Sequence, residues 1–264
     1  MKQLTVNGVR LNFWDEGQGA PLLLVHGFPL NHAMWREQLP ALAVRRRVIA
    51  PDLRGFGGSE VTGAAVVSMD QFADDCAALL DELGIREPIT FCGLSMGGYI
   101  GWSFVRRHGQ RLARLILCDT RAAADTPEAA ANRRKVADQV SAEGTQSLVR
   151  AMLPKLLARG TIENQPAVVE FLKEMMSASA PTGVAAAQRG MAERADAREL
   201  LSTIEIPALL IVGIEDAIST ADEMRGMAEA MPQAGLVIVQ DAGHMAPLEN
   251  PAIVNRAIED FLGD

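Results

Sequence analysis

Short apolar runs alternate with longer helical patterns along most of this chain, and this rhythm restricts its fold more than any other feature. Such runs are typical of strands buried on both faces, and the patterns between them are long enough for crossover helices. The sequence predicts an α/β protein with a mostly parallel eight-stranded sheet and helices on both faces. The expected strands are residues 4–6, 10–13, 22–25, 48–50, 89–92, 115–118, 208–212 and 236–240.

Two further local signals refine this outline. Asn7-Gly8 separates the first two strands and is typical of a two-residue hairpin, so these strands should pair antiparallel. The clearest helix prediction covers residues 69–83, where Ser68 can cap the first turn and Gly84 ends an apolar stripe. Other helical patterns occupy residues 33–42, 96–108, 221–230 and 251–262.

The rhythm changes between Asp119 and about Met191. This stretch is rich in Ala, Arg, Glu and Met and contains helical patterns but no convincing strand. We interpret it as a helical cap inserted after the sixth strand. The predicted organisation is an α/β core formed by residues 1–120 and 192–264, with a cap formed by residues 121–191.

The charge balance disfavours nucleic acid as a partner. The chain has 25 Lys and Arg against 33 Asp and Glu, a net charge of −8, and no basic block beyond Arg45 to Arg47. Its longest apolar runs fall far short of the roughly 20 residues of a membrane helix. The first residues also lack the apolar stretch of a secretory signal. We therefore expect a cytoplasmic protein that does not enter a membrane.

The cysteines indicate how the core is held together. Cys76, Cys92 and Cys118 are odd in number, widely spaced and set in apolar sequence. This pattern favours buried free thiols over a disulfide framework or a zinc site. No metal and no organic cofactor is implied.

A serine lies in a glycine-rich turn directly after the expected strand at residues 89–92. Gly93-Leu94-Ser95-Met96-Gly97-Gly98 places glycines two residues before and two residues after Ser95, and a helical pattern follows. Such a turn is too tight for side chains at the glycine positions and raises the serine hydroxyl at the carboxyl end of the sheet. Ser95 is therefore the candidate nucleophile.

A serine hydroxyl needs a base to take its proton and an acid to orient that base. His244 follows the last expected strand, where a loop at the sheet edge would place it beside Ser95. For the acid we choose Asp216, which follows the strand at residues 208–212. Adjacent Glu215 remains an alternative, and so does Asp119 at the end of the sixth strand.

The chemistry also needs N–H donors for the negative oxygen that forms on the substrate carbonyl. One donor is the amide of Met96, the residue after the nucleophile. The other is expected from the loop His26-Gly27-Phe28-Pro29, where Phe28 is the natural donor because Pro29 has no N–H. His26 itself is better explained as a residue that fixes this loop by a hydrogen bond.

Five segments together resemble the α/β-hydrolase family. The likeness covers residues 1–120 and 192–264, and it includes the insertion by position, where this family has its cap. It implies the α/β-hydrolase fold and a mechanism with a serine nucleophile. The segments are His26-Gly27, Asp52 to Ser59, Gly93 to Gly98, Gly213 to Asp216 and Gly243-His244.

Within this family the chain looks most like small bacterial carboxylesterases, 3-oxoadipate enol-lactonases and acyl-homoserine lactonases. All of them cleave a carboxylic ester, open or cyclic. The resemblance implies a serine hydrolase that acts on a small-molecule ester or lactone through an acyl-enzyme. The alternatives are an enzyme similar to 3-oxoadipate enol-lactonase and, from another class, a ligand-binding receptor or scaffold on the same fold.

Few residues of the substrate pocket can be named at this level. By resemblance, Asn31 and Trp35 are candidates, although helix packing explains Trp35 equally well. An enol-lactonase acting on a dicarboxylate would need arginines of the cap that face inward, toward the substrate. The sequence alone does not orient Arg133, Arg134 or Arg150.

Overall fold

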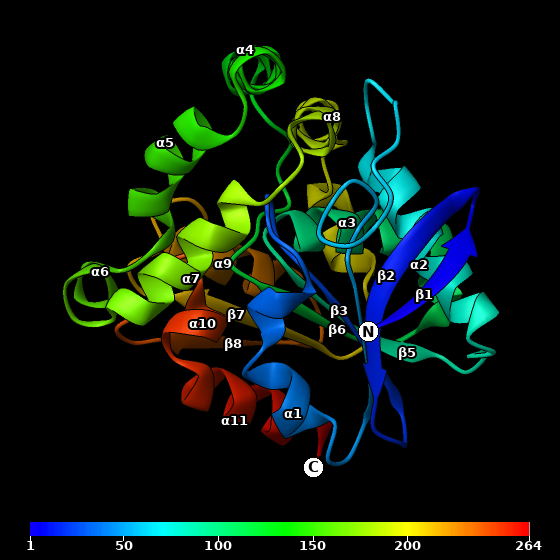
Figure 1. Ribbon diagram of the computed structural model, residues 1–264. Helices are drawn as coiled ribbons and strands as arrows, with labels where there is room; N and C mark the ends of the chain where they lie inside the picture. Colours follow the sequence, from blue (N-terminus) through cyan, green and yellow to red (C-terminus); the bar gives the residue numbers. More distant parts are fainter. Residues whose placement is uncertain (264) are drawn as a thin grey trace.

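The computed structural model describes residues 1–263, whose arrangement is shown in Figure 1. Within these residues an eight-stranded sheet has the order β1-β2-β4-β3-β5-β6-β7-β8. The β1–β2 and β2–β4 pairs are antiparallel and the other pairs are parallel, which confirms the predicted sheet. The strands are β1 (Lys2–Val6), β2 (Val9–Glu16), β3 (Pro21–Val25), β4 (Arg47–Pro51), β5 (Ile89–Leu94), β6 (Leu112–Cys118), β7 (Ala208–Gly213) and β8 (Ala234–Val239).

The predicted hairpin joins β1 to β2. Asn7 and Gly8 both have positive φ angles, 49° and 74°. Two consecutive residues of this kind make the turn whose twist matches that of the strands it connects. The antiparallel entry to the sheet therefore follows directly from these two residues.

Alternate side chains of the central strands pack into two cores, one on each face of the sheet. In β3, Leu23 and Val25 belong to one core, and Leu22 and Leu24 belong to the other. Successive side chains of a strand point to opposite faces, so a strand covered on both sides is apolar throughout. The first core includes α2 (Met69–Glu82), α3 (Met96–His108) and α9 (Ala221–Ala230), and the second includes α1 (Gln38–Leu42) and α11 (Pro251–Leu262).

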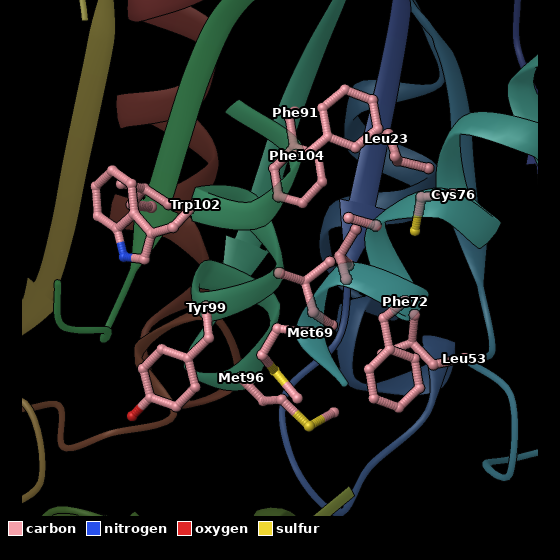
Figure 2. Close-up of a cluster of buried hydrophobic side chains, with 14 of the residues drawn as sticks. Leu23, Leu53, Met69, Phe72, Cys76, Phe91, Met96, Tyr99, Trp102 and Phe104 are labelled. Carbon is pink, nitrogen blue, oxygen red and sulfur yellow. The ribbon is translucent and has the colours of Figure 1, made fainter. Parts of the chain in front are cut away.

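Figure 2 shows part of the core on the α2 and α3 face. Phe91 of β5 and Phe104 of α3 pack there with their ring centroids 5.3 Å apart. Cys76 of α2 lies in this core, and Cys92 and Cys118 lie in the other. All three are free and buried, as the sequence predicts.

Helix α2 begins and ends close to the predicted positions. The Ser68 hydroxyl oxygen accepts a hydrogen bond from the backbone N–H of Gln71 at 3.1 Å, which satisfies one of the free donors of the first turn. The helix ends at Glu82, and Gly84 follows with a φ of 70°.

The single helix expected over residues 33–42 is wrong. The structure has a short 3₁₀ helix, η1 (His32–Trp35), followed after a turn by α1. Pro40 explains the break, because a proline has no N–H and its ring clashes with the preceding turn inside a helix. A new start at Gln38 places Pro40 in the first turn of α1, where a proline is tolerated.

Five α-helices lie between β6 and β7 in the described chain, and no strand is found among them. They occupy the upper and left part of Figure 1, away from α1 and α11. This agrees with a helical insertion after the sixth strand. The helices are α4 (Pro127–Glu143), α5 (Gln146–Leu156), α6 (Arg159–Asn164), α7 (Pro166–Ser177) and α8 (Pro181–Ala192).

Helix α8 rests directly on the backbone of the segment that leads from β4 to α2. A Cβ atom at Gly183 would lie 2.1 Å from the carbonyl oxygen of Gly55, and one at Gly190 would lie 1.8 Å from that of Val67. Neither contact leaves room for a side chain. Helix α8 therefore packs against this segment at two glycines.

The remaining elements are short: η2 (Gly109–Arg111), η3 (Arg198–Thr203) and α10 (Ala246–Glu249). Among residues 1–263 no helix has the length and apolar character needed to cross a bilayer.

Candidate active site

Ser95 occupies a strained turn between β5 and α3. Its φ of 55° lies in the left-handed region that residues with a side chain rarely adopt. A Cβ atom at Gly93 would lie 2.3 Å from the carbonyl oxygen of Gly97, and one at Gly97 would lie 2.3 Å from that of Val25. Both glycines are therefore required for the sharp turn, as the sequence predicts. The turn leaves the Ser95 side chain partly exposed.

Three distant segments of the chain meet at this turn. Ser95 Oγ lies 2.8 Å from His244 Nε2, and His244 Nδ1 lies 2.8 Å from Asp216 Oδ2. An Nδ1–H that donates to the carboxylate leaves Nε2 free to accept the proton of the serine hydroxyl. His244 and Asp216 are buried. The structure thus brings the predicted serine, histidine and aspartate into one hydrogen-bonded chain.

The carboxyl group of Asp216 is also held by its own loop. Its Oδ1 accepts hydrogen bonds from the backbone N–H groups of Ile218 at 2.7 Å and Ser219 at 3.0 Å. With the His244 ring, these amides give the carboxylate three donors. These hydrogen bonds hold the carboxyl group in place opposite the His244 ring.

Asp119, the alternative acid, has a different environment. Its Oδ1 accepts one hydrogen bond, from the backbone N–H of Gly213 at 2.9 Å, and its Oδ2 is buried without a partner among the described residues. Burial, together with the negative charge of Asp216, raises the pKa of Asp119 well above its usual range. The raised pKa favours the protonated form of Asp119, and no hydrogen bond joins this residue to His244 in the described chain. Glu215 points elsewhere, since its carboxylate accepts from the backbone N–H of Arg159 at 3.1 Å.

This difference gives a test on stability. The folded protein keeps the Asp119 proton above the pH at which the unfolded chain releases it. The contribution of the Asp119 carboxyl to the free energy of unfolding is therefore largest at low pH. It decreases as the pH rises from the pKa of the unfolded chain toward the pKa of the folded protein. Asp119→Asn removes that loss, and Asn tolerates the φ of 47° found here. We expect its stability relative to wild type to grow with pH above about 4, by at most about 1.4 kcal/mol per pH unit. Urea unfolding at several pH values measures this difference in the free energy of unfolding. A difference between the two proteins that stays constant with pH would contradict the prediction.

The two predicted N–H donors belong to the loop after β3 and to the start of α3. Met96 is the first residue of α3, and the N–H groups of a first helical turn have no partner within the helix. In the part of the chain that the structure describes, no backbone carbonyl accepts from the N–H of Phe28. Phe28 and Met96 are both buried. Within residues 1–263, neither amide donates to a backbone carbonyl.

The loop that carries Phe28 is fixed from two sides. His26 Nε2 accepts a hydrogen bond from the Leu53 N–H at 3.0 Å, so its Nδ1 carries the proton that faces Gly27 O at 2.9 Å. Complete burial lowers the pKa of His26 to about 4, so the ring is neutral. From the connection between α7 and α8, the Ser179 hydroxyl donates to the carbonyl oxygen of Pro29 at 2.7 Å. The loop-fixing role predicted for His26 is confirmed.

The two candidate pocket residues have structural partners. The Asn31 side chain accepts a hydrogen bond from the Ala33 N–H at 2.9 Å and so caps η1. Trp35 is fully buried in the core on the α1 and α11 face. This position corresponds to the packing alternative for Trp35.

Sequence reasoning missed Glu249, at the end of α10. Its buried carboxylate accepts four hydrogen bonds, two of them from the amides on either side of His244. The available signal was a lone acidic residue after the apolar stretch Met245 to Leu248. Most of its partners are backbone groups, which leave no pattern in the sequence. No cluster of three or more metal-ligating side chains occurs within residues 1–263.

A nucleophilic serine on a strand-to-helix turn, paired with histidine and aspartate from later loops, is typical of one large class of α/β proteins. The family model described as alpha/beta hydrolase fold matches residues 20–251. The chain belongs to the α/β-hydrolase family.

Individual relatives agree with this assignment. The chain is 31% identical to 3-oxoadipate enol-lactonase 2 of Acinetobacter baylyi, over 97% of this chain and 94% of that protein. It is similar to the structure of a thermophilic esterase from Thermogutta terrifontis, with a TM-score of 0.98, 45% identity and coverage of 100% and 98% of the two chains. It is also similar to the enol-lactonase from Burkholderia xenovorans LB400, with a TM-score of 0.91, 30% identity and 100% coverage of both chains.

Proposed function

We propose that this protein is a serine hydrolase that cleaves carboxylic esters or lactones through an acyl-enzyme. The observation that carries the proposal is the continuous hydrogen-bonded chain from Ser95 Oγ through the His244 ring to Asp216. An isolated serine hydroxyl is a weak nucleophile, and a neighbouring base that accepts its proton makes it reactive. The esterase and enol-lactonase names of the relatives support the same class of reaction.

The reaction proceeds in two halves. Ser95 Oγ attacks the ester carbonyl while its proton passes to His244 Nε2, and the resulting imidazolium is stabilised by Asp216. When the tetrahedral intermediate collapses, the bond to the alkoxy group breaks and His244 returns the proton to that leaving group. A water molecule then attacks the acyl-Ser95 ester, again with His244 as base, and releases the carboxylic acid.

The N–H groups of Phe28 and Met96 stabilise the negative oxygen of each tetrahedral intermediate. Both amides are free of backbone acceptors in the described chain, and Met96 lies at the positive end of the α3 dipole. Donors placed in advance where charge develops lower the barrier because they need no reorganisation during the reaction.

We further propose that residues 121–191 act as a cap over this site and that residues 1–120 and 192–264 form the catalytic core. The support comes from contacts between the inserted helices and the two loops of the site. Ser179 donates to Pro29 beside the Phe28 amide. The backbone N–H of Met245, next to His244, donates to the carbonyl oxygen of Leu156 at 3.1 Å.

We propose an uncharged ester or lactone rather than a dicarboxylate as the substrate, on the basis of three arginines of the inserted helices. Arg133 is paired with Asp125 and donates to Gln188 at 3.1 Å, while Arg134 and Arg150 are exposed. A dicarboxylate substrate needs an unpaired cation inside the pocket, because a buried charge must be compensated. The alternative of a 3-oxoadipate enol-lactonase-like enzyme is favoured by the relatives that carry that name.

A hydrolysis panel tests these assignments. It compares short and long p-nitrophenyl esters, acyl-homoserine lactones, an aliphatic lactone and a dicarboxylate enol-lactone. We expect many turnovers of short and medium uncharged esters and slow reaction of the dicarboxylate. Preferential turnover of the dicarboxylate would support the enol-lactonase alternative. Release of only about one equivalent of product from every substrate would instead indicate a ligand-binding receptor.

A further inference from the structure

We infer that Glu249 is a positioning residue that joins the His244 loop to helix α6 of the inserted segment, so that the placement of the base depends on the seating of that segment. This inference rests on the function proposed above. Its carboxylate accepts hydrogen bonds from both sides of this contact.

One oxygen of Glu249 binds the loop that carries the base. Oε1 accepts hydrogen bonds from the backbone N–H of Gly243 at 2.8 Å and from that of Met245 at 3.2 Å. These two residues are the immediate neighbours of His244. Their amides set the path of the backbone through His244 and therefore the direction of its ring.

The other oxygen binds the inserted segment. Oε2 accepts from the backbone N–H of Ala158 and from the hydroxyl of Thr161, both at 2.7 Å. The two sides also touch directly, since a Cβ atom at Gly243 would lie 2.7 Å from the Ala158 nitrogen. Because the two backbones pack this closely, a shift of α6 would also displace the His244 loop.

Four donors directed at one buried side chain require a carboxylate. Each oxygen of Glu249 accepts two hydrogen bonds, whereas the amide nitrogen of a glutamine can only donate. In either orientation, a glutamine side chain at this position would leave two donors facing an NH₂ group. Burial raises the pKa of Glu249 from its usual value, but all four hydrogen bonds favour the ionised form.

Glu249→Gln tests the inference when it is compared with Thr161→Val and Asp15→Asn. Thr161→Val removes only one donor on the α6 side. Asp15 is a buried carboxylate on β2 that accepts from Lys2 and Arg47, so Asp15→Asn reports the effect of losing such a group outside the site. The measurements are kcat and KM for p-nitrophenyl butyrate, the thermal midpoint, and the downfield proton resonance of His244 Nδ1–H.

We expect Glu249→Gln to lower kcat by about tenfold to a hundredfold, because displacements of about 1 Å have effects of this size. KM should change by less than about threefold, and the Nδ1–H resonance should shift or broaden. Thr161→Val should change kcat and the resonance in the same direction by smaller amounts. Asp15→Asn should lower the thermal midpoint and leave both kcat and the resonance as in wild type.

The inference is overturned if folded Glu249→Gln keeps both the wild-type kcat and the wild-type resonance, or if Asp15→Asn reproduces its effects. If Glu249→Gln does not fold, an unchanged kcat and resonance in Thr161→Val overturns it. Failure of the proposed function has a different signature, namely no ester turnover by wild type or full turnover by Ser95→Ala. In that case the resonance alone decides the role of Glu249, since it reports the His244–Asp216 hydrogen bond without turnover.

Discussion

Ser95→Ala is expected to lower kcat for p-nitrophenyl acetate or butyrate by about 10⁴-fold to 10⁶-fold, the range found when a nucleophile of this kind is removed. Alanine lacks the oxygen that attacks the carbonyl, so no acyl-enzyme can form. It retains a Cβ atom and places no new group in the turn between Gly93 and Gly97. The variant should therefore keep the fold, as circular dichroism and the thermal midpoint will show.

Ser219→Ala is the matched control. Ser219 lies in the loop of Asp216 and is buried, but its contribution is the backbone N–H that donates to Asp216. Its hydroxyl has no partner among the described residues. Removing this hydroxyl should leave kcat close to the wild-type value. Unchanged turnover by Ser95→Ala would remove Ser95 from the mechanism.

Asp216→Asn is expected to lower kcat by about 10⁴-fold. An asparagine presents an NH₂ group or an uncharged oxygen to His244 Nδ1. It therefore stops holding the tautomer in which Nε2 accepts the Ser95 proton and no longer stabilises the imidazolium. Asp119→Asn, the same change at the neighbouring buried aspartate, should stay within about tenfold of wild type because the raised pKa of Asp119 favours its uncharged form and no hydrogen bond joins it to the ring in the described chain.

The pair of variants separates the two candidate acids. The measurement is kcat for p-nitrophenyl butyrate near pH 7.5 together with the thermal midpoint of each protein. Reversal of the order, with Asp119→Asn the inactive variant, would assign the acid to the end of β6 rather than to the loop after β7.

Much of the fold can be predicted from the sequence because its signals are local. The strands are apolar on both faces, and Asn7-Gly8 specifies a turn with two positive φ angles. Gly93 and Gly97 likewise predict the position of Ser95, since any side chain there would collide with the backbone. The expected helix over residues 33–42 is instead divided into η1 and α1, because Pro40 is tolerated only in the first turn of a helix.

The choice between acids depends on information that the sequence does not carry. Asp119 and Asp216 both follow a strand of the parallel sheet, so their positions along the chain are equivalent. They differ in the number of backbone N–H groups directed at each carboxyl, and every residue except proline has such a group. The same reason hides Glu249, which binds amides that belong to segments far apart in the sequence.

The identity of Ser95 as the acyl carrier is tested most directly by quenching a reaction with p-nitrophenyl butyrate in acid within its first turnover. Mass spectrometry of the intact protein and of its peptides then locates the label. We expect a mass increase equal to one butyryl group, confined to the peptide that contains Ser95 and absent from Ser95→Ala. Turnover with the butyryl group on another residue, or an equal label on Ser95→Ala, would contradict the proposed role of Ser95.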